Sequence, residues 1–173
     1  FVHFLLGPAV VGLAVPLARA WPTVRRLALP VSGTLAVGSA VALATAVGIA
    51  WALGASPGTL ASLAPKSVTA PIAMGIAERT GGVAALAAVF TVATGIIGAA
   101  LGKFVFDAVG VRDMRARGFA LGLAAHGIGT ARAFQVNPEA GTYAGLAFGL
   151  HGVFAAFLLP YLWRLAQVLA GTL

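Results

Sequence analysis

Residues 31–53 read VSGTLAVGSAVALATAVGIAWAL and contain no charged side chain. At a rise of about 1.5 Å per residue, a helix of this length crosses a hydrocarbon layer of about 30 Å. Trp51 lies near its end, where an aromatic residue suits the membrane interface. This stretch therefore predicts a transmembrane helix, and it indicates an all-α membrane fold.

The composition of the whole chain agrees with a membrane protein. Of its 173 residues 60% are apolar and 9% charged, whereas a soluble domain has about 25% charged residues. The net charge of +7 does not indicate nucleic-acid binding, because the arginines lie in short loops between apolar runs, as the positive-inside rule predicts. The sequence has no cysteine, which excludes disulfides, thiolate zinc sites and thiol catalysis.

Three further apolar runs complete the predicted spans, at residues 1–18, 83–102 and 142–162. The chain opens with Phe1 inside an apolar run, so we expect the sequence to begin within a longer protein. A basic loop containing Arg25 follows the first run, and a second basic loop covers residues 103–117. Tyr161, Trp163 and Arg164 form an interfacial anchor at the end of the last span.

Two segments interrupt this pattern, at residues 59–82 and 118–141. Their polar centres read APKSVTAP at 64–71 and HGIGTAR at 126–132. Proline and glycine make a continuous helix improbable there, so each segment is predicted as two short helices around a polar tip. Each is followed by a full span, which gives two units, 59–102 and 118–162, within a single transmembrane domain over 1–173.

The two units match at six positions when shifted by 60 residues, which favours an internal repeat. Sequences of such low diversity also produce identities by coincidence.

Loop charge predicts how the broken segments lie in the membrane. If both basic loops are cytoplasmic, an even number of crossings separates them, so residues 59–82 enter and return as a re-entrant hairpin. A second hairpin entering from the opposite face makes the units inverted, with tips that meet near the midplane. In the alternative geometry each broken helix crosses completely and places residues 112–117 outside.

Each polar tip contains one cation, Lys66 or Arg132, without a local counter-ion. The next carboxylates along the chain are distant, because Glu78 lies twelve residues after Lys66 and Glu139 lies seven residues after Arg132. A cation near the bilayer centre costs about 2.5 to 3.5 kcal/mol on insertion scales. One interpretation is that both cations reach the interface or pair with carboxylates outside this sequence. The functional interpretation is an anion site.

Helix N-termini support the anion site, because Thr69 and Thr130 are placed as N-caps whose helices would point at the midplane. Broken helices of this kind bind anionic substrates in secondary transporters. His126 could bind substrate or carry a proton, whereas His3 and His151 are interpreted as structural. The predicted substrate-binding residues are Lys66, Ser67, Thr69, His126, Gly127, Gly129, Thr130 and Arg132.

Catalytic motifs give no support for an enzyme. The four acidic residues form no obvious acid and base pair, and no Walker loop or His-Glu-x-x-His occurs. We therefore expect no enzyme activity, no cofactor and no bound metal.

Residues 62–74, SLAPKSVTAPIAM, and 125–133, AHGIGTARA, resemble the two most recognisable stretches of the LrgB/CidB family. The segment LGPA at 6–9 is similar to an earlier stretch of the same family. The resemblance implies a multi-pass protein of the bacterial inner membrane with a small LrgA/CidA-like membrane partner. Members of this family usually have further N-terminal helices.

The resemblance implies two alternative functions. One is antiholin-like control of murein hydrolase export and cell lysis. The other is carboxylate transport, since plant relatives are plastid glycolate/glycerate translocators and some bacterial relatives are linked to pyruvate movement. The cationic tips favour a transporter or facilitator of small carboxylates such as pyruvate, lactate, glycolate or glycerate. We expect it to act as a homodimer.

Overall fold

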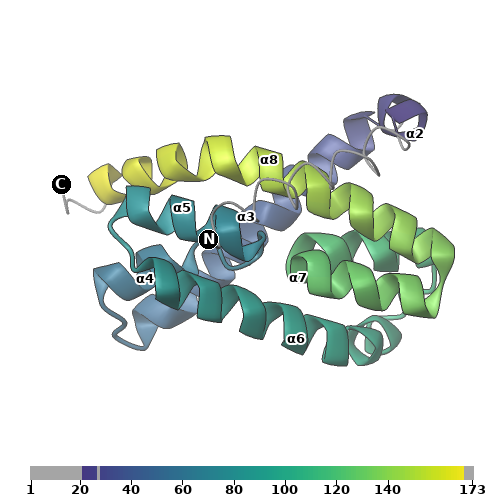
Figure 1. The fold of residues 1–173 in the computed structure, drawn as a ribbon, viewed down its shortest axis with the longest axis horizontal. Helices are drawn as coiled ribbons and strands as arrows, with labels where there is room; N and C mark the ends of the chain where they lie inside the picture. Colours follow the sequence, from purple (N-terminus) through teal and green to yellow (C-terminus); the bar gives the residue numbers. More distant parts are fainter. Residues whose placement is uncertain (1–20, 27, 170–173) are drawn as a thin grey trace, which may run out of the picture.

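The computed structural model describes residues 21–26 and 28–169, and all regular structure in these ranges is helical (Figure 1). The predicted span at 1–18 lies outside the described residues. The helices are α2 (Trp21–Arg26), α3 (Ala28–Ala52), α4 (Pro57–Leu63), α5 (Ala70–Thr80), α6 (Ala84–Ala108), α7 (Met114–Val136) and α8 (Pro138–Leu169). The prediction of an all-α membrane fold is confirmed.

Three of the described helices, α3, α6 and α8, are long and apolar enough to cross a membrane. They correspond to the predicted spans 31–53, 83–102 and 142–162, and each extends beyond its predicted span at one or both ends. Helix α6 continues to Ala108, and its last turns carry an ion pair of 2.8 Å between Lys103 and Asp107, one helical turn apart. The loop predicted from Lys103 to Arg117 is therefore confined to residues 109–113.

The first interrupted segment folds as a helical hairpin of α4 and α5, joined by residues 64–69. Its two outer ends lie close together, since a Cβ on Gly58 in the first turn of α4 would lie 3.7 Å from the Gly81 carbonyl oxygen. The Val83 N–H, just after α5, also donates to Ser62 Oγ in the last turn of α4 at 2.7 Å. Gly82 allows this approach, since a Cβ there would lie 2.8 Å from the backbone nitrogen of Ser62. Gly81 ends α5 in the left-handed conformation, with φ at 80°.

The second interrupted segment is α7, which consists of two helical halves joined by a sharp turn. Ala125 and His126 have non-helical backbone angles. A Cβ on Gly118 in the first half would collide with Ala140 of α8, and one on Gly141 of α8 would collide with Phe134 in the second half. Both ends of α7 therefore lie beside the start of α8, and α7 is a second hairpin.

The break in α7 lies earlier than the sequence pattern suggested. The prediction that Thr130 caps a helix is wrong, because Thr130 lies inside α7 and its hydroxyl donates to the His126 carbonyl at 2.9 Å. Glycine at 127 and 129 was interpreted as helix-breaking. Gly129 is instead required by packing, since a Cβ there would lie 2.6 Å from the Leu121 carbonyl oxygen.

The two hairpins open toward opposite ends of the molecule. Helix α3 runs parallel to the first half of α7. A Cβ on Gly38 of α3 would lie 3.0 Å from the Leu123 side chain of α7. Nearer the start of each helix, Pro30 of α3 and Arg115 of α7 line the same groove. The outer ends of α7 and the start of α3 thus share one end. The outer ends of α4 and α5, where Gly58 approaches the Gly81 carbonyl, lie at the other end, next to the end of α3 (Figure 1).

Candidate functional site

Lys66 and Ser67 lie in the turn between α4 and α5. Pro65 cannot continue the α4 hydrogen-bond ladder, and the chain turns through bonds from the Lys66 N–H to the Leu63 carbonyl and from the Val68 N–H to the Pro65 carbonyl, at 3.0 and 3.1 Å. The Lys66 ammonium donates to Ser67 Oγ at 3.2 Å. Within residues 21–26 and 28–169, no acidic side chain forms an ion pair with Lys66.

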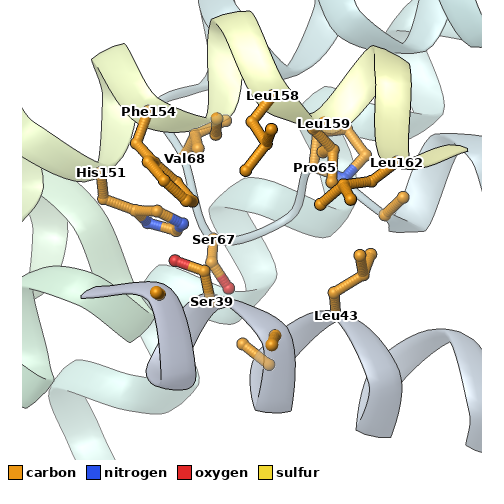
Figure 2. Close-up of a pocket in the computed structure, with 15 residues that line it drawn as sticks. Ser39, Leu43, Pro65, Ser67, Val68, His151, Phe154, Leu158, Leu159 and Leu162 are labelled. Carbon is orange, nitrogen blue, oxygen red and sulfur yellow. The ribbon is translucent and has the colours of Figure 1, made fainter. Parts of the chain in front are cut away.

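A cavity of about 170 Å³ lies beside this turn, lined by α3, by residues 64, 65, 67 and 68 and by α8 (Figure 2). This volume exceeds the roughly 15 Å³ of probe-occupied space that one water needs. Three polar side chains line it, Ser39 from α3, Ser67 from the turn and His151 from α8. The remaining lining side chains are apolar, among them Leu43 and Phe154. Lys66 itself is not in the lining, and its ammonium reaches the cavity wall through Ser67.

Two polar atoms in this lining are buried without a hydrogen bond. His151 is 5% exposed, and in the described part of the chain neither its Nδ1 nor Ser39 Oγ has a hydrogen-bond partner. The His151 ring also lies within hydrogen-bonding reach of the backbone of Leu123 and Ser67, and within electrostatic range of Lys66. Buried polar groups in proteins are almost always satisfied, so this pair points to a ligand or ordered water.

The sequence interpretation missed His151 and Ser39 as site residues. A histidine inside a membrane span is a functional candidate by default, and this was the available signal for His151. Nothing local to either residue indicates that α3 and α8 bring them to the 64–69 turn.

His126 occupies a different place, at the break in α7. Its side chain is 5% exposed, and Nε2 lies 2.8 Å from the Thr91 carbonyl oxygen of α6. Gly95 allows this contact, since a Cβ at that position would lie 2.7 Å from the imidazole. His126 therefore joins α6 to α7 and does not line the cavity beside Lys66.

The remaining predicted residues separate into two groups. Thr69 is the N-cap of α5, without a capping hydrogen bond from its side chain, and it lies two residues after Ser67. Arg132 lies in the second half of α7, where it is exposed and donates to Gln135 at 3.3 Å. The prediction placed Arg132 in a polar tip, but the turn of α7 is at Ala125 and His126, which leaves Arg132 away from it.

Comparison with known proteins identifies relatives over most of the chain. The Bacillus subtilis (strain 168) uncharacterized protein YwbG is 35% identical over 91% of this chain and 70% of that protein. The holin-like protein CidB of Staphylococcus epidermidis is 26% identical over 94% of this chain and 71% of CidB. The plastidal glycolate/glycerate translocator 1 of Arabidopsis thaliana is 30% identical over 88% of this chain and 30% of that protein.

No solved structure matches the chain. The model of the LrgB-like family matches residues 1–165. Because this match covers nearly the whole sequence, the chain belongs to the LrgB-like family.

Proposed function

We propose that this protein transports small organic anions such as pyruvate, lactate, glycolate or glycerate, and that Lys66 binds their carboxylate. The observation that carries the proposal is the position of Lys66, which lies in a helix break beside a cavity and forms no ion pair within the described ranges. An anion entering this cavity would offset the cost of holding the ammonium away from water.

The neighbouring groups suit a carboxylate. Ser67 Oγ already accepts from Lys66, so its own proton is free to be donated to an anion. Helix α5 begins at Ala70, shortly after Ser67, and its first N–H groups carry the partial positive charge of a helix N-terminus. The proposed carboxylate site therefore comprises Lys66, Ser67 and the segment that starts at Thr69.

The membrane arrangement forms part of the proposal. The two hairpins would re-enter from opposite faces of a bacterial inner membrane, with their turns near the midplane. This makes residues 59–102 and 118–162 inverted repeat units of one domain. The close approach of Gly58 to the Gly81 carbonyl supports the re-entrant geometry, because it brings the outer ends of the first hairpin to the same place.

Helix α7 would contribute from the other side of the site, with His126 and Gly127 at its turn and Gly129, Thr130 and Arg132 in its second half. His126 packs against Thr91 in this conformation. A role in substrate binding would therefore require the α7 turn to move during transport.

Two relatives carry names that favour different functions. The Arabidopsis relative is named as a glycolate/glycerate translocator, which supports carboxylate transport. The Staphylococcus relative is named as a holin-like protein, which supports the second candidate, an antiholin-like regulator of murein hydrolase export and lysis. In either case we propose a homodimer that works with a small LrgA/CidA-like membrane protein, and we propose no enzyme activity or cofactor.

Uptake into liposomes tests the transport function. The purified protein, with and without the LrgA/CidA-like partner, should take up pyruvate with saturation and in competition with lactate. Lys66→Gln should lower uptake at subsaturating pyruvate at least about tenfold, because a hydrogen bond to a charged group contributes about 1.5 to 3 kcal/mol.

The matched control is Lys103→Gln, since Lys103 is exposed and paired with Asp107. Its uptake should equal that of the unmodified protein. Leakage of neutral sugars, limited by size and indifferent to Lys66, would contradict transport and favour the lysis regulator.

A further inference from the structure

The cavity beside Lys66 has a second polar wall that the carboxylate site leaves unused. Ser39 Oγ and His151 Nδ1 are buried and form no hydrogen bond with any described residue. Figure 2 shows the two side chains reaching into the same space as Ser67, from α3 and α8 respectively. Three separate segments therefore direct polar groups into one small volume.

We propose that Ser39 and His151 determine specificity by binding the oxygen substituent on carbon 2 of the carboxylate held at Lys66. This inference rests on the proposed function. The site then has a charged part, which holds the carboxylate, and a neutral part, which selects the substituent on the adjacent carbon.

The chemistry of the two side chains fits either oxidation state of that substituent. A serine hydroxyl donates and accepts, and a neutral imidazole has one nitrogen that donates and one that accepts. The pair can donate to a keto oxygen or accept from a hydroxyl group. A 2-oxo acid and a 2-hydroxy acid would both satisfy it, whereas an acid with a bare methylene would leave both groups unpaired.

The rest of the cavity limits the size of the substrate. Its other lining side chains are apolar, including Leu43, Val68 and Phe154, and they offer no hydrogen bond to a longer polar chain. A second carboxylate there would lose its hydration without gaining a cation. The site is therefore expected to prefer short monocarboxylates with one oxygen on carbon 2.

Competition between acids of equal length tests this assignment. Uptake of radiolabelled lactate into liposomes is measured against unlabelled pyruvate, lactate and propionate, which differ at carbon 2. With the unmodified protein, propionate should compete at least about tenfold more weakly than pyruvate or lactate, because sites built for a hydrogen bond reject analogues that lack it.

Ser39→Ala and His151→Leu should each bring the inhibition constants for propionate and lactate closer together. Both variants should still require Lys66, since the carboxylate part is unchanged. Thr45→Val is the matched control on α3, because its exposed hydroxyl bonds only to backbone carbonyls of its own helix, and its discrimination should equal that of the unmodified protein.

The outcomes separate this inference from the proposed function. The assignment of Ser39 and His151 is overturned if lactate uptake is saturable but propionate competes as well as lactate. It is also overturned if both variants still discriminate between lactate and propionate as the unmodified protein does, which is the result expected if the cavity holds only water. If the unmodified protein takes up no carboxylate, the proposed function itself fails. Should His151→Leu not fold, Ser39→Ala tests the same part from a different helix.

Discussion

Among the described residues other than glycine, His126 is the one with a positive φ, at 42°. A side chain in this region of backbone space costs about 1 to 3 kcal/mol and persists where surrounding contacts hold it. Here the contact is the bond from the imidazole to the Thr91 carbonyl, 2.8 Å long and buried against α6. The turn of α7 thus depends on one strained residue and its link to a neighbouring helix.

Substitutions at His126 should reverse the usual order of glycine and alanine. Both His126→Gly and His126→Ala remove the bond to Thr91, but only alanine keeps the strain of a positive φ. In an ordinary helix glycine is less stable than alanine by about 1 kcal/mol. Here His126→Gly should be the more stable variant by about 1 kcal/mol, as measured by thermal unfolding of the purified protein.

The control for this comparison is Gly48, where a Cβ would meet no atom within 4 Å. Gly48→Ala lies in the regular helix α3 and should leave stability unchanged or raise it. If His126→Ala proved more stable than His126→Gly, the turn would not depend on backbone strain at this residue.

One buried hydroxyl joins the last turn of α4 to the chain just after α5. Ser62 is fully buried, and its Oγ donates to the Gly58 carbonyl at 2.7 Å while accepting from the Val83 N–H at the same distance. Ser62→Ala would leave the Val83 N–H without its acceptor, which costs about 1 to 3 kcal/mol. We expect a lower thermal unfolding temperature and faster hydrogen exchange at the Val83 amide.

A matched change at the exposed end of the same hairpin separates capping from the Ser62 contact. Ser56 caps α4 by accepting from the Thr59 N–H at 3.3 Å. Ser56→Ala should cost about 1 kcal/mol or less and leave exchange at Val83 unchanged. Equal effects of the two substitutions would contradict the special role of Ser62.

The start of α7 depends on the charge of Asp113. Its carboxylate accepts from Arg115 and from the N–H groups of Arg115 and Ala116, which lowers the pKa of Asp113 to about 2. A carboxyl group with a lowered pKa contributes stability above its unfolded pKa of about 3.9, and this contribution is lost as the pH falls through about 2.

Hydrogen exchange at the Arg115 and Ala116 amides should therefore accelerate as the pH falls from about 4 to about 2, relative to unstructured peptides at the same pH. Asp113→Asn keeps an oxygen for capping but removes the charge, so exchange at these amides should be faster at neutral pH and the additional acid step should disappear. An acid step of equal size in Asp113→Asn would assign it to another group.

Across the whole molecule, the sequence predicted those features that are determined by residues close together in the chain. The span at α3 follows from an uncharged run, and the break beside Lys66 follows from Pro65 and Pro71. Pro71 then falls in the first turn of α5, where its missing N–H is tolerated. These predictions need no knowledge of neighbouring helices.

The features that the sequence did not predict depend on contacts between helices. The α7 turn is at His126 because α6 supplies a carbonyl acceptor and Gly95 gives room for the ring. The Ser39 and His151 wall exists because α3 and α8 meet the 64–69 turn. In each case a short-range pattern cannot show which distant segment completes the environment.

The parallel packing of α3 and the first half of α7 leads to a prediction about topology. The groove that joins Pro30 to Arg115 places the start of both helices at one end, and both are preceded by basic residues, among them Arg25 and Arg112. The positive-inside rule assigns this end to the cytoplasm. Leu53, at the end of α3 and 82% exposed, should then face the opposite side.

Because the sequence has no cysteine, single substitutions to cysteine report the side directly. Arg25→Cys and Arg112→Cys should react with a membrane-impermeant maleimide in inverted vesicles and not in intact cells, whereas Leu53→Cys should show the reverse pattern. Each label should be blocked by the same reagent applied first from the expected side. Labelling of Arg25→Cys and Arg112→Cys from opposite sides would require an odd number of crossings between them and would rule out a first hairpin that re-enters.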